Sequence, residues 1–209
     1  MKSLTTNTIN RRGLPIILQQ LIASCALLIL SPLLLLVALL IKLESNGPVI
    51  FSQIRVGENG RQFRCFKFRS MYLPGSPQLA NVSMGKSDRS GICQKFFNDP
   101  RVTKTGRIIR KLSIDEIPQL VNVLKGDMAI IGPRPHLVTE YMQYDPSVLE
   151  RLNCKPGLTG LWQVSGRADT TFEQQLMLDK QYIANQSFWL DVRIFFATIP
   201  AVLLAKGAY

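Results

Sequence analysis

This chain has few of the side chains that build metal centres or covalent cross-links. Its 209 residues include one histidine and four cysteines, and no two of them have the spacing of zinc ligands. The cysteines lie far apart in the sequence, so a disulfide framework is not expected, which agrees with a reducing compartment. There is also no internal repeat and no low-complexity tail. The sequence therefore argues against a zinc site and against a disulfide-linked secreted domain.

Charge is also absent from a long stretch, because no residue between Gly13 and Ile41 carries one. Within it, Leu21–Ile41 is almost wholly apolar and, at ~1.5 Å per residue, can cross a hydrocarbon core of ~30 Å. A signal peptide is a poor match, since its apolar core is shorter and ends in small residues at a cleavage site. Helices of soluble cores rarely have such a long apolar run. We therefore expect this segment to insert into a membrane.

Ser31 and Pro32 lie in the middle of the apolar run. The proline lacks a backbone donor, frees the carbonyl of Leu28 and crowds the preceding turn, so a kink or break is expected there. The Ser31 hydroxyl can bend the helix further by bonding back to the carbonyl of Leu27. Basic residues flank the run on both sides, and positive segments favour the cytoplasmic side. We favour a re-entrant helix-break-helix and keep a kinked spanning helix as the alternative.

The net charge of +11 is divided into +3 before the apolar run and +8 after it. Such a balance suits nucleic acid, an anionic lipid surface or phosphorylated substrates. Because a membrane segment is expected and no nucleic-acid recognition motif is found, we expect lipid and phosphate as partners and no nucleic acid. We divide the chain into a membrane segment, residues 1–43, and one compact domain with a modest core, residues 44–209.

The second domain is expected to be α+β and mostly helical. The β-rich runs Val49–Arg55 and Gln62–Phe68 flank the turn residues 58–60, a pattern typical of a β-hairpin. Residues 73–99 are rich in proline and glycine and indicate a long loop. The helical segments that the sequence predicts are Arg107–Lys125, Leu137–Leu152 with an interruption at Pro146, and the run from Phe172 to the C-terminus.

The last apolar segment, Phe188–Leu204, has two interpretations. Its aromatic side chains Trp189, Phe195 and Phe196 suit the headgroup layer of a membrane, as in an amphipathic interfacial helix. An ordinary C-terminal core helix is almost as compatible with the same residues.

The main candidate for chemistry is a pair of adjacent carboxylates, Asp115 and Glu116. Ser113, three residues before Glu116, completes a capping-box pattern, so we expect a helix to begin at Ile114. Both carboxylates would then lie in its first turn, where the positive helix end favours their ionised forms. Acidic residues are common at that place, and Glu116 could serve only as a cap.

Basic side chains precede this carboxylate pair. Arg107, Arg110 and Lys111 lie just upstream and can receive phosphate oxygens. Two adjacent carboxylates can hold a divalent cation such as Mg²⁺ together with the phosphates of a substrate. An ionised aspartate beside such a cation can also act as a nucleophile toward phosphorus. The pattern therefore favours phosphate chemistry at Asp115.

Two other positions place basic side chains where the backbone is restricted. Lys67 and Arg69 lie at the end of the second expected strand, and Arg134 is held between Pro133 and Pro135, which fix its direction. Each of these could be a solvated surface charge. The two prolines and a neighbouring glycine favour a binding role for Arg134.

The order of these motifs resembles that of the bacterial sugar transferases, the monotopic phosphoglycosyl transferases. The resemblance covers the chain from about Leu21 to its C-terminus. The motifs are Ser31-Pro32, Phe-Lys-Phe-Arg-Ser-Met (66–71), Leu-Ser-Ile-Asp-Glu-Ile-Pro-Gln-Leu (112–120), Leu-Lys-Gly-Asp-Met (124–128), Gly-Pro-Arg-Pro (132–135), Lys-Pro-Gly-Leu-Thr-Gly (155–160) and Trp-Gln-Val-Ser-Gly-Arg (162–167). It implies a membrane helix broken at Ser31-Pro32 and a catalytic domain on the cytoplasmic face of the bacterial inner membrane.

The resemblance also implies a reaction and its substrates. A sugar 1-phosphate would move from a UDP-sugar to polyprenyl (undecaprenyl) phosphate, the first step in making an exopolysaccharide, capsule or O-antigen. Asp115 would attack the β-phosphorus and release UMP, and the polyprenyl phosphate would then displace Asp115 from a covalent phosphosugar–aspartate. An inactive basic membrane-surface adaptor is the alternative function, which the carboxylate pair and its arginines disfavour.

Further roles are implied residue by residue. Asp115 and Glu116 would hold Mg²⁺, Arg110 would bind a phosphate, and Lys67 would be a weaker substrate contact. Arg134, in the clamp formed by Pro133 and Pro135, would contact the uridine nucleotide.

In one place the chain departs from the family pattern. Members often carry a basic residue and an aspartate just before the membrane helix, whereas this stretch reads Ile16-Ile-Leu-Gln-Gln20. Any helix-stabilising contact of that aspartate is therefore in doubt. The residues before Leu21 are too few for the additional spanning helices of longer relatives, so we expect a minimal enzyme or a catalytic fragment. The C-terminal Lys-Gly-Ala-Tyr resembles relatives that transfer a hexose 1-phosphate, and the sequence does not indicate the oligomeric state.

Overall fold

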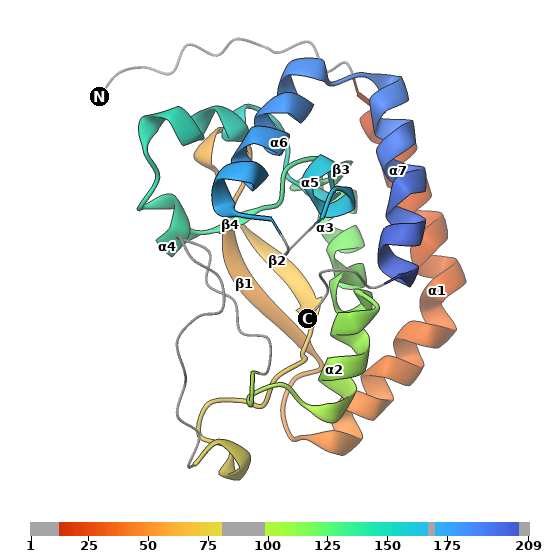
Figure 1. Cartoon of the computed structure of the whole chain (residues 1–209). Coiled ribbons are helices and arrows are strands. Elements are labelled where there is room, and N and C mark those ends of the chain that lie inside the picture. The colour runs from red at the N-terminus through yellow and green to blue at the C-terminus, as the bar shows by residue number, and fades with distance from the viewer. Residues whose placement is uncertain (1–12, 81–98, 167–169, 205–209) are drawn as a thin grey trace.

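A computed structural model describes residues 13–80, 99–166 and 170–204 of the chain. The fold is α+β and mostly helical, as predicted, with two long helices along one side and a small sheet beside them (Figure 1). The α-helices are α1 (Ile16–Glu44), α2 (Lys104–Lys111), α3 (Leu120–Leu124), α4 (Val138–Tyr141), α5 (Leu161–Val164), α6 (Phe172–Asn185) and α7 (Phe188–Leu203). The 3-10 helices are η1 (Glu58–Gly60), η2 (Pro77–Leu79), η3 (Ile114–Gln119) and η4 (Pro146–Asn153).

The predicted β-hairpin is confirmed. Strands β1 (Ile50–Val56) and β2 (Gln62–Phe68) pair antiparallel, with Ile50 opposite Phe68 at one end. Strand β4 (His136–Leu137) adds to the free edge of β1. A second, parallel pair joins β3 (Ala129–Ile131) to β5 (Gly157–Thr159). The hairpin and these short strands bring residues from distant parts of the chain to one place.

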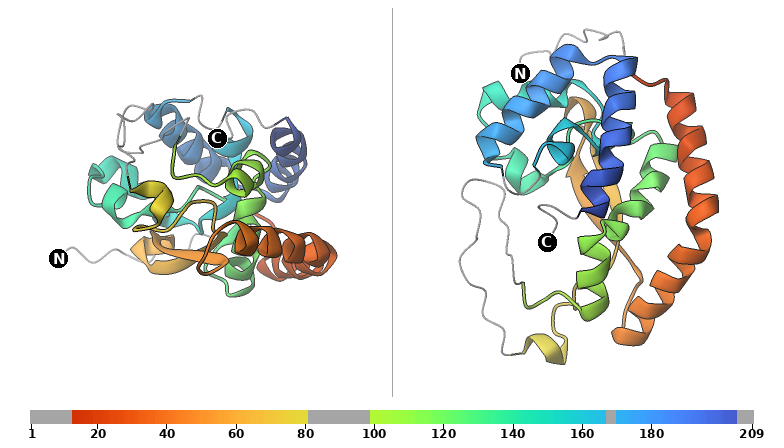
Figure 2. Two further views of the ribbon diagram at one scale, coloured as in Figure 1. Left: turned by 90° about the horizontal axis from the view of Figure 1, so that it is seen from below. Right: turned by 45° about the vertical axis from the view of Figure 1, so that its right-hand side comes forward.

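Helix α1 passes through Pro32 without interruption, so the predicted break is not confirmed. The ribbon instead changes direction about half way along (Figure 1 and Figure 2). Pro32 cannot donate to the carbonyl of Leu28, and the Ser31 hydroxyl donates to that carbonyl over 2.8 Å. The sequence predicts a bond from Ser31 to the carbonyl of Leu27. The Ser31 hydroxyl instead binds the Leu28 carbonyl, which is the one that Pro32 leaves without a backbone partner. The helix is long and apolar enough to cross a membrane.

Buried polar side chains hold the N-terminal end of α1. The backbone N–H of Leu14 donates to the Asp191 carboxylate over 2.8 Å, and the Tyr182 hydroxyl donates to the other oxygen over 2.9 Å. Gln19 donates to the carbonyl of Leu14 and accepts from the N–H of Ile130. No aspartate precedes α1 in this sequence. Asp191, on α7, instead places a carboxylate at the start of α1.

The C-terminal end of α1 is tied to the elements that follow it. The guanidinium of buried Arg69 donates to the carbonyls of Ser45 and Asn46, both over 2.7 Å, so Arg69 is not a solvated charge. The Glu44 carboxylate accepts from the N–H groups of the first two residues of α2, over 2.6 and 2.9 Å. The end of α1 thereby fixes the start of α2.

Two of the predicted helices are divided. The segment Arg107–Lys125 contains α2, η3 and α3, because Ser113 has a φ of 55° and turns the chain between the first two. The Ser113 side chain forms no capping hydrogen bond, so the predicted capping box is wrong. The predicted helix Leu137–Leu152 is divided into α4 and η4, because the residue before Pro146 disfavours the α conformation. The helices predicted from Phe172 onward are confirmed, and most of the long loop predicted over residues 73–99 lies outside the described residues.

We expect the Asp191→Ala variant to unfold at a lower temperature than the parent protein. The change removes the buried acceptor of the Leu14 N–H, which costs ~1–3 kcal/mol, and it leaves the Tyr182 hydroxyl with the longer contact of 3.3 Å to the carbonyl of Ile131. Thermal unfolding in detergent micelles measures the loss. Asp191→Asn keeps one acceptor oxygen and should lose less stability, and equal melting temperatures for all three proteins would contradict the assigned role.

Candidate active site

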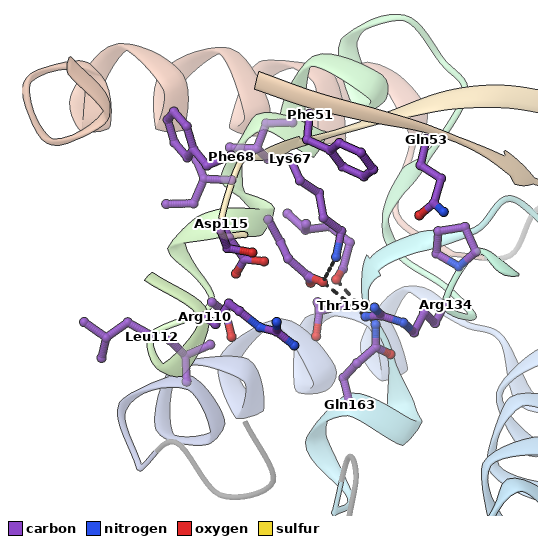
Figure 3. A pocket seen from close by; sticks show the side chains of 18 of the residues that line it. Phe51, Gln53, Lys67, Phe68, Arg110, Leu112, Asp115, Arg134, Thr159 and Gln163 are labelled. Atoms are coloured by element: carbon purple, nitrogen blue, oxygen red, sulfur yellow. Dashed lines mark hydrogen bonds and ion pairs between the residues drawn. The ribbon is translucent and has the colours of Figure 1, made fainter. Parts of the chain in front are cut away.

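A cavity of about 1140 Å³ contains most of the residues singled out in the sequence. Lys67, Arg110, Asp115 and Arg134 point into the same space (Figure 3). They come from β2, the last turn of α2, η3 and the turn before β4. Glu116 and Pro135 also line the cavity, whereas Pro133 does not. Ser31 and Pro32 lie on α1 and are not among the lining residues.

Glu116 binds two cationic side chains. Its Oε1 atom lies 2.5 Å from Lys67 Nζ and 3.2 Å from an Arg134 guanidinium nitrogen. Burial opposes ionisation of Glu116, but the charges and hydrogen bonds of Lys67 and Arg134 outweigh it and hold its pKa well below the usual range. The same interaction raises the pKa of Arg134. Glu116 is therefore a paired carboxylate that is ionised at neutral pH.

Asp115 is in a different state from its neighbour. Its side chain is 8% exposed, and its carboxylate forms no hydrogen bond or ion pair with the part of the chain that the structure describes. Burial raises the pKa of Asp115 to about 6, the Glu116 charge acts in the same direction, and Lys67, Arg110 and Arg134 oppose the rise. An unpaired carboxylate near its pKa at neutral pH has oxygen lone pairs available for a substrate.

Local backbone geometry aims Asp115 at the cavity. The positive φ of Ser113 ends α2 and starts η3, which packs against β2. Asp115 and Glu116 are adjacent residues of this 3-10 turn, and both line the cavity. Figure 3 shows the Arg110 guanidinium reaching into the cavity beside Asp115.

Hydrogen bonds reinforce the stiffness of the Pro133–Pro135 clamp. The carbonyl of Pro133 accepts from the N–H of Gly157 over 2.9 Å, and the carbonyl of Pro135 accepts from the Arg55 guanidinium over 3.2 Å. The peptide group before Arg134 and the peptide group after Pro135 are therefore fixed to neighbouring strands. This explains why the Arg134 side chain can reach Glu116 across the cavity.

Asn122 is a positioning residue that the sequence analysis did not single out. It is fully buried; its amide oxygen accepts from the N–H of Phe66 over 3.1 Å, and its amide nitrogen donates to the carbonyl of Arg64 over 2.7 Å. These bonds attach α3 to β2 next to Lys67. The available sequence signal was a single polar residue within the apolar segment Leu120–Leu124.

Asp115 and Glu116 fit a metal site that the protein shares with the phosphates of a substrate. No cluster of three or more histidine, cysteine, aspartate or glutamate residues suitable for a metal occurs in residues 13–80, 99–166 and 170–204. Mg²⁺ commonly takes one or two protein carboxylates and completes its shell with substrate phosphates and water. Asp115 and Glu116 supply hard oxygen donors of the right number for such a shared site.

Comparisons with known proteins identify similar sequences along nearly the whole chain. The family described as "Bacterial sugar transferase" matches residues 11–205. The exopolysaccharide production protein ExoY of Rhizobium meliloti is 43% identical over 190 residues, which cover 90% of this chain and 84% of that protein. The undecaprenyl-phosphate galactose phosphotransferase of Salmonella typhimurium is 44% identical over 169 residues.

Some relatives are much longer than the matched region. The UDP-glucose:undecaprenyl-phosphate glucose-1-phosphate transferase of Escherichia coli is 39% identical over 196 residues, covering 90% of this chain but 40% of that protein. The Salmonella protein matches over 79% of this chain and 36% of its own length. The chain thus spans well under half of these two relatives.

In the protein without divalent cations, we expect the Asp115 carboxyl to lose its proton near pH 6 rather than near its usual value of 3.8. Burial disfavours the charged form, so the carboxyl stays protonated as the pH rises through the lower value. Infrared difference spectra can follow the carboxyl band, identified by its loss in Asp115→Asn. Lys67→Met should move the midpoint higher, because the Lys67 charge lowers this pKa; a midpoint below pH 4.5 in the parent would contradict the assignment.

Proposed function

The chain belongs to the bacterial sugar transferase family, and on that premise we propose that it transfers a sugar 1-phosphate from a UDP-sugar to undecaprenyl phosphate. The observation that carries the proposal is the unequal state of the two adjacent carboxylates. Glu116 is bound by Lys67 and Arg134, whereas Asp115 is buried, has no hydrogen bond or ion pair to the described residues, and is influenced by the charges of Lys67, Arg110 and Arg134. This arrangement suits a nucleophilic aspartate that receives a phosphate group.

In the first step, an Asp115 oxygen attacks the β-phosphorus of the UDP-sugar. The new bond joins the carboxylate to phosphorus, and the bond from phosphorus to the bridging oxygen breaks, so UMP leaves with that oxygen. Arg110, Lys67 and Arg134 line the same cavity and stabilise the negative charge on the phosphates. We assign Arg134 to the uridine nucleotide, because its clamp holds it in a fixed direction.

In the second step, a phosphate oxygen of undecaprenyl phosphate attacks the same phosphorus. The bond between phosphorus and the Asp115 carboxylate breaks, the carboxylate is regenerated and the product is an undecaprenyl diphosphate sugar. Splitting the transfer lets one cavity handle two bulky phosphates in turn. Glu116, held in place by its two cations, keeps the polar end of the cavity assembled through both steps.

We also propose a Mg²⁺ ion shared between the protein and the UDP-sugar. Asp115 and Glu116 would hold it before the reaction, together with the diphosphate. When bound, it would neutralise part of the phosphate charge.

For the sugar, we propose a hexose. Two relatives are named for transferring galactose and glucose phosphate, respectively, and they match this chain over most of its length. UDP-galactose and UDP-glucose are accordingly the first donors to test. The exopolysaccharide name of a third relative supports a role in starting such a polymer.

For the topology, we propose that α1 enters the inner membrane and returns, with residues 44–209 as the catalytic domain on the cytoplasmic face. The bend of α1 near its middle (Figure 1) and the basic residues on both sides of the apolar run support this arrangement. On α7, Trp189 is 75% exposed and Phe196 is 62% exposed, which supports an interfacial position for that helix.

The nucleophile is tested by mixing enzyme with UDP-glucose or UDP-galactose in the absence of acceptor. The parent should release a burst of UMP of at most one per active site and carry a phosphosugar on the peptide containing Asp115. Asp115→Asn should abolish the adduct and lower transfer by on the order of 10⁴-fold or more. Glu150→Gln, a matched change at an exposed carboxylate, should behave as the parent. Release of UDP in place of UMP would refute the mechanism.

The topology is tested with single cysteines in a background without other cysteines. Lys2→Cys lies before α1, and Lys180→Cys lies on α6 after it. A maleimide that cannot cross membranes should label neither site in intact cells, and both sites after the inner membrane is permeabilised. Labelling of one site in intact cells would show a spanning helix and contradict the re-entrant form.

A further inference from the structure

We propose that the apolar wall of the cavity, formed by one face of α1 and one face of α7, binds the first isoprene units of the polyprenyl phosphate acceptor. The inference rests on the proposed function, because it adds the place of the lipid tail to the same site. The "isoprene wall" is defined here by the cavity-lining residues Ile22, Ala26, Leu30, Phe195, Ile199 and Val202.

The α1 part of the isoprene wall follows helix geometry. Ile22, Ala26 and Leu30 are four residues apart and therefore share one face of the helix. All three line the cavity and are partly exposed. Leu28, two residues from Ala26, points to a different face and is 75% exposed. One stripe of the membrane-inserting helix is thus turned toward the catalytic cavity.

The α7 part has the same periodicity. Phe195, Ile199 and Val202 are spaced by four and three residues, so they also form one stripe. Ile199 is 51% exposed although it lines the cavity, so protein atoms leave much of this apolar surface uncovered. Figure 2 shows α7 running along the same side of the molecule as α1. Exposed apolar surface facing a cavity is a typical site for a hydrocarbon ligand.

The isoprene wall and the reacting group belong to one cavity. The same hollow is lined by Asp115 and Arg110, and its volume of about 1140 Å³ exceeds the ~300–1,000 Å³ of most small-molecule sites. A ligand that fits its chemistry has an anionic phosphate at one end and a branched hydrocarbon at the other. Polyprenyl phosphate has this composition, and its phosphate must reach the phosphorus bound to Asp115.

The competing occupant is an acyl chain of a membrane phospholipid. Its headgroup phosphate is a diester, whose single negative charge makes its non-bridging oxygens weaker nucleophiles than those of a phosphate monoester. The continuity of the apolar wall with the carboxylate and arginine therefore favours the polyprenyl monoester. This choice determines the design of the test.

Two bulky substitutions narrow the cavity from opposite sides: Ala26→Phe on α1 and Ile199→Trp on α7. Each should lower kcat/KM for undecaprenyl phosphate by about tenfold or more, as expected for shape changes in an apolar pocket. The acceptor-free UMP burst should keep its parental size, because the donor does not use this wall. Leu28→Trp, the matched control on another face of α1, should leave both measurements at the parental level.

The isoprene wall would be overturned if both narrowed variants kept the parental burst and the parental kcat/KM for undecaprenyl phosphate. It would also be overturned if Leu28→Trp lost as much kcat/KM as the narrowed variants. A parent that gives no burst would instead refute the proposed function. Loss of the burst in a narrowed variant would reflect damage to its fold, so a second measurement uses the parent protein.

Polyprenyl phosphate with a diazirine on its first isoprene unit should label α1 or α7, and undecaprenyl phosphate should compete. Labelling elsewhere, or competition by phosphatidylglycerol, would overturn the proposal.

Discussion

The ion-paired carboxylate of Glu116 determines how the rest of the cavity is arranged. Through Lys67 and Arg134 it joins β2, η3 and the turn before β4. Buried charge pairs cost desolvation energy, so their partners have to be held in good geometry. Asn122 provides this support on β2, and Arg55 provides it at the proline clamp. With Glu116 paired to both cations, Asp115 is the carboxylate that we propose as the nucleophile.

The long apolar helix α1 is part of this arrangement rather than an appended segment. At its start, Asp191 and Gln19 attach α1 to α7 and β3. At its end, Glu44 fixes the first turn of α2, the helix that carries Arg110 into the cavity. A displacement of α1 would therefore move both the apolar wall of the cavity and the Arg110 side chain. Helix α1 and the side chains around Asp115 are in this way mechanically linked.

Local patterns predicted those elements whose cause is local. The apolar run predicted α1, and two β-rich runs around turn residues predicted the hairpin β1–β2. The capping box at Ser113 failed because Ser113 adopts a left-handed conformation that its residue type does not signal, in the turn before η3, which contacts β2. The carboxylate at the start of α1 comes from Asp191, 177 residues after Leu14. Partners so distant leave no periodic signal in the sequence, so Asn122 and Asp191 needed the fold to be recognised.

The bend near Pro32 lets the two halves of α1 follow different surfaces. Before it, Ile22 and Ala26 pack beside the main core and line the catalytic cavity. After it, Val37 and Ile41 pack in a separate cluster with side chains of β2 and α2. A straight helix leaving the first surface would continue past the second. Since the Ser31 hydroxyl supplies the partner that Pro32 removes from the Leu28 carbonyl, the helix can change direction without leaving that carbonyl unpaired in an apolar environment.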